Sequence, residues 1–209
     1  ITVNGVVVTE LGTRVHRNDT VQYKGKTLSF EKPVYILMNK PKDCVTTVED
    51  PHAELTVIDL LHGEVPERVY PVGRLDKDTT GVLLLTNDGE LATKLMHPTF
   101  ERVKIYHVFL DRPVSKNDLV QLTEGVDLDG EFVYADTVSY PDPEDKTQLG
   151  IEIHSGQNRV VRRMMEAIGY KVKKLDRVYF AGLTKKNVRR GEWRYLTEKE
   201  INMLKRGIY

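Results

Sequence analysis

The apolar run GVLLLT, residues 81–86, constrains the fold of this chain more than any other segment. A strand this apolar is expected to be buried on both faces, so it needs neighbouring strands and a covering layer on each side. The chain of 209 residues is long enough for one such domain with a small appendage. Directly before this strand stand Arg74 and Asp76, in GRLDKDTT, a concentration of charge that an ordinary surface loop does not need.

The other periodic segments predict a mixed body of strands and helices after a linker at Glu31-Lys32-Pro33. Further strands are expected at 34–40, 68–73, 102–110, 149–154 and 171–180, with a hairpin over 128–140. Helices are expected at 55–61, 90–96, 115–125 (opened by a Ser115/Asp118 capping box) and 158–170, with a last helix capped by Thr197 and Glu200. No regular βαβ repetition appears. We therefore expect an α+β fold, a mixed and largely antiparallel sheet with flanking helices.

Residues 1–30 alternate short Val-rich runs with turn sequences such as Asn-Gly and Lys-Gly-Lys. This pattern predicts a few short strands, too few to be stable without packing on something else. We therefore expect two domains, residues 1–32 and 33–209.

Charge is distributed unevenly although the chain has 31 basic and 31 acidic residues. Residues 159–194 hold twelve Lys or Arg and three Asp or Glu, whereas residues 111–152 hold three basic and eleven acidic residues. A basic segment with interleaved aromatic residues is suited to phosphate groups. A solvated charged surface explains the same pattern about equally well.

Two composition features concern the cellular location. The one cysteine, Cys44, excludes an internal disulfide and is typical of a reducing compartment. No apolar run approaches the roughly 20 residues of a membrane span, and no signal peptide is evident. These features predict a cytoplasmic protein that does not contact membranes.

Asp76 itself has three interpretations. It could shape the turn by bonding nearby N–H groups. Asp76-x-Asp78-x-Thr80-Gly81 also fits the first half of a calcium loop, but Asn87 stands at the twelfth position, where a bidentate Glu is needed. The third interpretation is a catalytic carboxylate. Glycine spacing matches neither nucleotide-binding pattern, and no zinc-site or Ser-His-Asp signature is visible, so a carboxylate with basic neighbours is what the sequence offers for catalysis.

Three motifs in order resemble the pseudouridine synthases, specifically the RsuA-type branch that acts on ribosomal RNA. They are GRLDKDTTGVLLLTNDGE (73–90), RVKIYHV (102–108) and GQNRVVRRM (156–164). The resemblance covers about residues 34–200 and implies the pseudouridine synthase fold. Residues 1–32 resemble the C-terminal part of an S4 RNA-binding module, which implies a truncated S4 module before the catalytic domain.

The resemblance implies the site residues. Asp76 is the essential carboxylate, and Arg162 is the cation that keeps it ionised. Tyr106 stacks on the target base and assists removal of the C5 proton. Thr80 and Gly81 are structural, and Thr80 bonds across the turn to hold Asp76. The residues implied in substrate or RNA binding are Arg74, Lys104, Asn158, Arg159, Arg163 and Leu175.

The resemblance therefore predicts a monomeric isomerase that converts one uridine of ribosomal RNA into pseudouridine, without a cofactor or a metal. The partners expected are ribosomal RNA or ribosomal assembly particles, and the acidic segment 124–140 favours large-subunit over small-subunit RNA. The alternative is a catalytically silent RNA-binding or ribosome-assembly factor, which would not require Asp76, Tyr106 and Arg162 together.

Overall fold

The computed structural model describes residues 1–16, 18–28, 31–97 and 103–209. The chain divides into two compact units, Ile1–Pro33 and Val34–Tyr209. Within the described residues, no helix is both long and apolar enough to cross a bilayer.

The smaller unit is a four-stranded antiparallel sheet. Its strands are β1 (Thr2–Val3), β2 (Val6–Val7), β3 (Val21–Tyr23) and β4 (Lys26–Leu28), in the order β2-β1-β3-β4. Apolar side chains remain largely uncovered in this unit, since Val6 and Val7 are 67% and 69% exposed. The expected short strands are thus present, and they bury little apolar surface.

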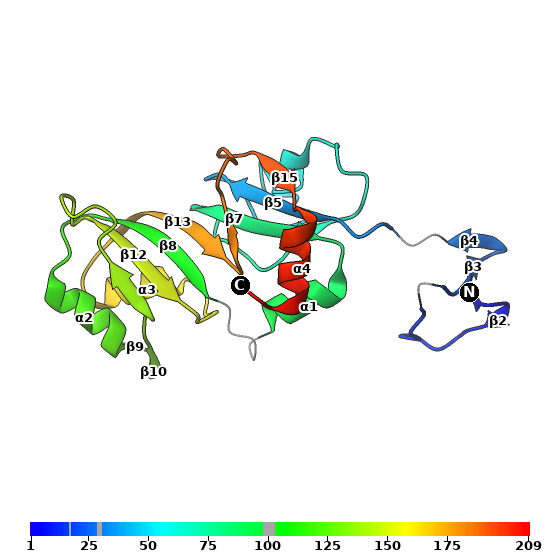
Figure 1. Cartoon of the computed structure of the whole chain (residues 1–209), viewed down its shortest axis with the longest axis horizontal. Helices are drawn as coiled ribbons and strands as arrows, with labels where there is room; N and C mark the ends of the chain where they lie inside the picture. The colour runs from blue at the N-terminus through cyan, green and yellow to red at the C-terminus, as the bar shows by residue number, and fades with distance from the viewer. Residues whose placement is uncertain (17, 29–30, 98–102) are drawn as a thin grey trace. The chain divides into compact units, whose positions relative to one another are not determined.

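The larger unit is built on one nine-stranded sheet (Figure 1). The strands are β5 (Tyr35–Lys40), β6 (Tyr70–Pro71), β7 (Thr79–Thr86), β8 (Lys104–Leu110), β11 (Thr137–Ser139), β12 (Gln148–Ile153), β13 (Val172–Phe180), β14 (Leu183–Thr184) and β15 (Trp193–Tyr195). The main order is β11-β12-β8-β13-β7-β5-β15, with β14 beside β13 and β6 beside β7. Strands β13 and β7 pair in parallel, and the other described pairs of this sheet are antiparallel.

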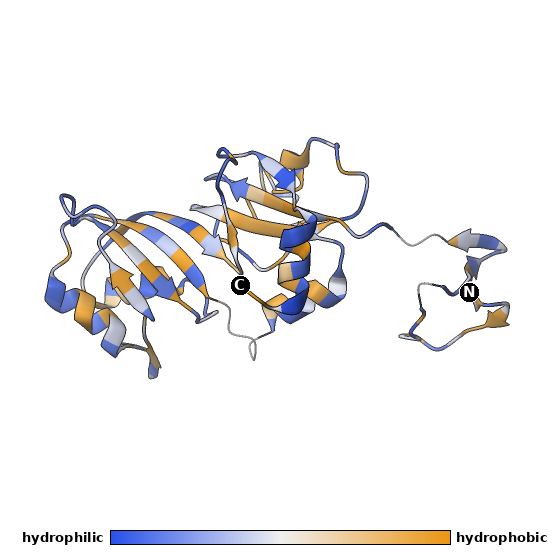
Figure 2. Ribbon diagram, in the orientation of Figure 1, coloured by the Kyte–Doolittle hydropathy of each residue, from blue (hydrophilic) through white to orange (hydrophobic). Residues whose placement is uncertain are grey.

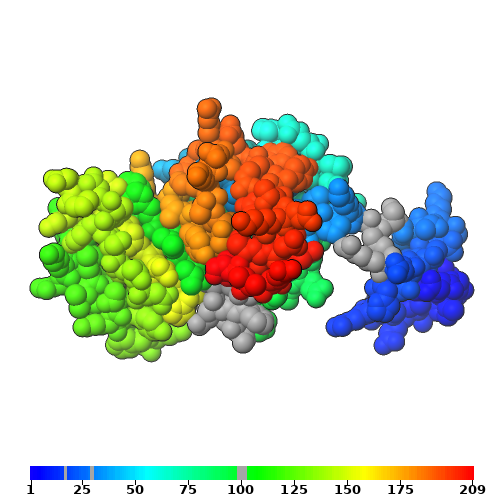
Figure 3. All heavy atoms as spheres, in the orientation of Figure 1, coloured from blue at the N-terminus to red at the C-terminus, as the bar shows by residue number. Residues whose placement is uncertain are grey.

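Helices flank this sheet, and a small hairpin lies apart from it. The helical segments are the 3-10 turn η1 (Asp59–Leu61) and the helices α1 (Gly89–Met96), α2 (Lys116–Glu124), α3 (Val160–Ala167) and α4 (Glu198–Arg206). The hairpin joins β9 (Val126–Leu128) to β10 (Glu131–Val133). In Figure 3, α4 lies on the surface of the larger unit. The α+β class and the mixed, largely antiparallel sheet predicted from the sequence are confirmed.

Strand β7 is buried on both faces, as its apolar sequence predicts (Figure 2). Val82 and Leu84 pack with the apolar sides of α1 and α4. Leu83 and Leu85 face the opposite layer, where they meet the irregular segment that includes Cys44 and Leu61.

The other half of the sheet has a core of its own. Alternate residues of β8 and β12, such as Val108 and Ile151, pack against α2 and against the apolar stripe of α3. Tyr106 lies on the same side as Val108, whereas His107 and Phe109 stack on each other. The predicted alternation along this strand is confirmed from residue 103 onward; its first predicted residue, 102, lies outside the described residues.

Two predicted elements are wrong in extent. The helix expected over 55–61 is only the η1 turn, because backbone groups of Leu55 and Val57 bond to Val45 and cannot bond along a helix. The strand expected over 68–73 is reduced to Tyr70–Pro71, whose partner is β7.

The predicted helix starts rest on local capping and are present in the structure. Asp88 caps α1, and Thr197 with Glu200 forms a reciprocal capping box on α4. At α2 the Ser115 hydroxyl accepts from the Asp118 amide. Each cap satisfies backbone donors that the first turn of a helix leaves free.

Candidate active site

Asp76 lies in the segment 72–78 between β6 and β7, which we call the Asp76 loop. Its backbone is held from within the protein by Lys40, the last residue of β5, which has no exposed surface. The Lys40 ammonium donates to the carbonyls of Asp76 (3.0 Å), Lys77 (3.3 Å), Thr79 (2.7 Å) and Pro41 (3.1 Å). Burial lowers the pKa of Lys40 to about 8.

Two further contacts fix the same loop. The Thr46 hydroxyl donates to the Leu75 carbonyl at 2.7 Å and accepts from the Leu75 amide at 3.2 Å. The Asp43 amide donates to the Lys77 carbonyl at 2.9 Å. Because these bonds involve backbone groups, they set the position of the loop and leave the Asp76 carboxylate available for other partners.

The Asp76 carboxylate faces the first turn of α3. Arg159 Nη1 lies 2.9 Å from Asp76 Oδ2, and Arg162 Nε lies 4.0 Å from the same oxygen. Arg162 also approaches Asp78 Oδ2 at 3.5 Å and donates to the Thr79 hydroxyl at 3.2 Å. The Asp76 side chain is 29% exposed. Of the residues predicted from the sequence, Asp76, Arg159 and Arg162 are thus brought together, with Arg159 nearest.

The sequence of α3 explains this placement. Val160, Val161 and Met164 belong to the core, which turns the intervening arginines toward the Asp76 loop. Arg159 precedes the helix with a left-handed backbone (φ 53°), and Arg162 follows three residues later, so both reach the same carboxylate. Within the described structure, the buried Nε of Arg162 has no hydrogen-bond partner.

Arg163 points elsewhere. Its guanidinium pairs with Asp129 Oδ2 at 3.2 Å, in the turn of the β9–β10 hairpin, and does not join the Asp76 group.

Tyr106 and Leu175 lie on neighbouring strands, β8 and β13. Leu175 is buried in the core shared with α3, and Tyr106 packs against that core. Leu175 is also the register partner of Thr79, the residue at which β7 begins after the Asp76 loop. Both side chains therefore belong to the sheet beside this loop.

The remaining predicted residues are peripheral. Arg74 and Asn158 are exposed, and Lys104 Nζ donates to the Ser155 carbonyl at 3.2 Å. Arg74 belongs to the Asp76 loop, whereas Asn158 precedes α3.

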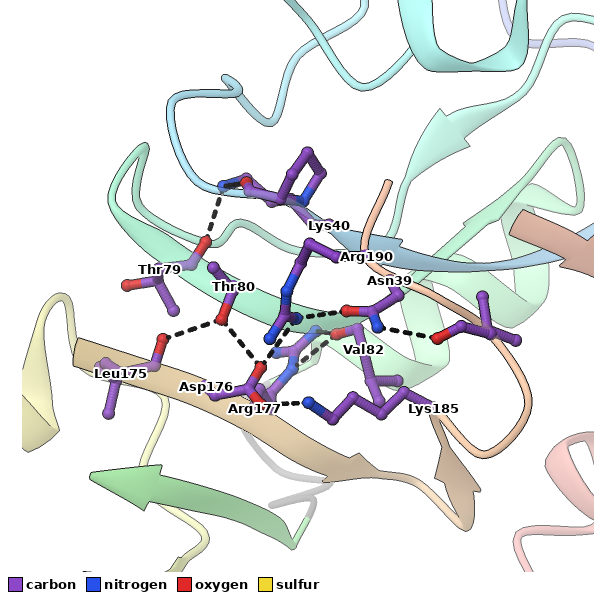
Figure 4. A network of polar contacts seen from close by, with 12 residues as sticks. Asn39, Lys40, Thr79, Thr80, Val82, Leu175, Asp176, Arg177, Lys185 and Arg190 are labelled. Carbon is purple, nitrogen blue, oxygen red and sulfur yellow. Dashed lines mark hydrogen bonds and ion pairs between the residues drawn. The ribbon is translucent and has the colours of Figure 1, made fainter. Parts of the chain in front are cut away.

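One predicted contact is wrong. The Thr80 hydroxyl does not bond to Asp76; it donates to Asp176 Oδ1 at 2.8 Å and to the Leu175 carbonyl at 3.4 Å (Figure 4). The reason is the alternation of β7, which turns Thr80 toward β13. Gly81 is structural, as expected: a Cβ at this position would lie 2.1 Å from the Arg177 carbonyl oxygen.

Sequence reasoning missed Lys40, Asp176 and Arg177. Asp176 accepts from Lys185 and from Arg190 Nη1 (3.1 Å), and these bonds lower its pKa against the opposing effect of its burial. Arg190 also donates to Asn39 of β5, so this network joins three strands of the sheet (Figure 4). A lysine directly after an apolar strand and before Pro41 was a usable signal for Lys40. A lone acid among the basic residues 171–177 was the signal for Asp176.

The calcium interpretation of this loop has little structural support. Asp76 and Asp78 face two guanidinium groups, and Thr80 is engaged by Asp176. Among the described residues, no group of three His, Cys, Asp or Glu side chains could hold a metal ion.

Comparison with known proteins agrees with this arrangement. A family profile described as RNA pseudouridylate synthase matches residues 34–167. Ribosomal large subunit pseudouridine synthase B of Bacillus subtilis is 40% identical over 208 residues, covering 98% of this chain and 85% of the relative. The dual-specificity RNA pseudouridine synthase RluF of Escherichia coli is 33% identical over 91% of this chain and 65% of its own length.

A crystal structure of a pseudouridylate synthase superposes with a TM-score of 0.76 at 28% identity, covering 97% of this chain and 87% of that one. The sequence, the fold and the family profile agree. The chain therefore belongs to the RNA pseudouridylate synthase family, a family of isomerases.

Proposed function

We propose that this chain converts a specific uridine of ribosomal RNA into pseudouridine, with large-subunit RNA favoured over small-subunit RNA, and that it belongs to the RsuA-type branch. The relatives named above support ribosomal RNA as the substrate. The observation that carries the proposal is the placement of Asp76: its backbone is fixed by a buried lysine while its carboxylate lies beside two arginines.

The reaction breaks the N1–C1′ bond of uridine and forms a C5–C1′ bond, while C5 loses a proton and N1 gains one. No atom enters or leaves the substrate, so the chemistry requires no co-reactant. Asp76 either adds to the nucleoside or removes a sugar proton to give a glycal, and both routes need it ionised. Arg162 and Arg159 favour that charged form.

Tyr106 and Leu175 form the proposed wall for the detached base. Taking a base out of a folded RNA costs a few kcal/mol. Phosphate contacts from Arg74, Lys104, Asn158, Arg159 and Arg163 offset this cost.

The test is isomerisation of unmodified ribosomal RNA, mapped by carbodiimide-dependent reverse-transcription stops. We expect wild type to create one new stop and Asp76→Asn to lose about 10³-fold or more of the rate. Asp78→Asn is the matched control, since Asp78 shares both arginines. RNA binding without any stop from wild type, on naked RNA and on ribosomal particles, would favour the silent binder.

We also propose that Ile1–Pro33 is the C-terminal part of an S4-like RNA-binding module. Its exposed Lys24 and Lys26, on the turn of the β3–β4 hairpin, are suited to phosphate contacts. We expect replacement of both lysines by alanine to weaken RNA binding and to reduce the salt dependence by about two phosphate contacts. An unchanged salt dependence would argue against this role.

A further inference from the structure

Arg177, in the middle of β13, is a buried cation that the proposed mechanism does not use. It is 4% exposed. Its Nε and Nη2 both donate to the Val82 carbonyl, at 2.9 and 2.8 Å (Figure 4). The guanidinium carbon lies 4.5 Å from the centre of the Phe180 ring. Arg177 is therefore rigidly held between two strands.

A buried charge is normally paired with an opposite charge, because leaving water is costly. Within the described part of the chain, no carboxylate forms an ion pair with Arg177. The neighbouring carboxylate, Asp176, is taken by Lys185, Arg190 and Thr80. Burial lowers the pKa of Arg177, yet a guanidinium stays protonated in proteins. A carbonyl and an aromatic ring leave its charge only partly compensated.

The group that completes the environment of Arg177 is Tyr106. The β8–β13 register places these two residues opposite each other, next to an irregularity of β13 between Arg177 and Tyr179. The guanidinium hydrogen-bonds to the Tyr106 phenol, and that phenol is also the ionisable group whose negative charge would favour the charged guanidinium. Tyr106 is only partly buried, so its ring spans from this cation toward the surface.

We propose that Arg177 is a positioning residue for Tyr106 in the isomerisation. A guanidinium has only donors, so the phenolic oxygen accepts from Arg177 and its own hydrogen must point elsewhere. Arg177 thereby fixes both the ring and the direction of the O–H group, and it stabilises negative charge that the oxygen gains as it hands on its proton. This inference rests on the proposed function, in which Tyr106 contacts the target base.

A double-mutant cycle under single-turnover conditions tests the proposal. We expect Arg177→Met to lower the rate of isomerisation about 30-fold or more, with RNA affinity changed less than about 3-fold. In the Tyr106→Phe background, the same change should lower the rate by less than about 3-fold further. Equal losses in both backgrounds would show that Arg177 acts only on the fold, and would overturn the proposal. Phe180→Leu, which removes the ring contact alone, is the control, and its loss should be the same in both backgrounds.

A second measurement does not require an Arg177 variant to fold. Tyr106→Phe removes the phenol and leaves the buried cation with one partner fewer. We expect it to lower Tm by about 4 °C or more. Tyr140→Phe is the matched control, since the Tyr140 hydroxyl donates to a neutral carbonyl, that of Val114, at 2.6 Å. A smaller loss for Tyr106→Phe than for Tyr140→Phe would contradict the pairing.

The two levels of the argument fail differently. Full activity of Asp76→Asn would refute the proposed function. An inactive Asp76→Asn variant together with independent effects of Arg177 and Tyr106 would refute the positioning role alone.

Discussion

Lys40 and Arg159 hold the same loop from opposite sides in different ways. Lys40 is fully buried and binds four backbone carbonyls. The Arg159 side chain is 44% exposed and binds the Asp76 carboxylate. The inner side therefore determines where the backbone runs, whereas the outer side holds a charge that solvent or an RNA phosphate can reach. A reactive carboxylate can thus be rigidly placed and still exchange its partner.

The largest effect should come from the inner side at Gly81. Gly81 has a φ of +116°, and a Cβ there would lie 2.1 Å from the Arg177 carbonyl oxygen. We expect Gly81→Ala to lower the free energy of unfolding by about 4 kcal/mol or more, because backbone must move. Urea unfolding followed by the fluorescence of Trp193 measures it.

Gly73, in the Asp76 loop, is the matched control. It also has a positive φ (+77°), but a Cβ there meets nothing within 4 Å. Gly73→Ala should lower the free energy of unfolding by only about 1–2 kcal/mol. Equal losses at the two glycines would contradict the contrast between the two sides.

Lys40→Met should have the next largest effect. Methionine fills a similar volume but donates no hydrogen bond, so four carbonyls lose their donor. We expect a loss of about 3 kcal/mol in the free energy of unfolding, with a large fall in isomerisation. Lys77→Met, an exposed neighbour in the Asp76 loop, should change stability by about 0.5 kcal/mol or less. A tolerant Lys40→Met variant would mean that Thr46 and Asp43 suffice to hold the loop.

The pH dependence of stability gives a smaller and more specific effect. Burial lowers the pKa of Lys40 from 10.5 to about 8, so between these values the unfolded chain binds more protons than the folded one. Stability contributed at this site therefore rises from about pH 8 to about pH 10.5. The measurement is the difference in unfolding free energy between wild type and Lys40→Met across this range. A difference that stays flat or falls would be contrary to expectation.

Arg159→Ala should have the smallest effect on stability, about 1 kcal/mol or less, because its ion pair is solvent-exposed. If Arg159 passes to an RNA phosphate, its loss should reduce the slope of log affinity against log salt by about one. Filter binding between 50 and 200 mM salt (about a fourfold range) suffices. Lys116→Ala, in the acidic region on α2, is the control and should leave the slope unchanged.

Local sequence signals determined much of the architecture. The apolar run 81–86 predicted a doubly covered strand, and Val82 to Leu85 are fully buried between two layers. Thr197 with Glu200 predicted the start of α4, and a reciprocal capping box is present. These features depend on residues close together in the chain, so a sequence pattern contains the information needed.

The tertiary structure decided what required distant segments to meet. It placed Lys40 under Asp76, 36 residues away, and Arg159 closer than Arg162 to the carboxylate. It directed Thr80 to Asp176 and opposed Arg177 to Tyr106. It also replaced an expected helix at 55–61 by a bridge to Val45. Sequence periodicity specifies which face a residue takes, but strand order and register specify which partner it meets. Those depend on packing over the whole sheet, for which no local pattern exists.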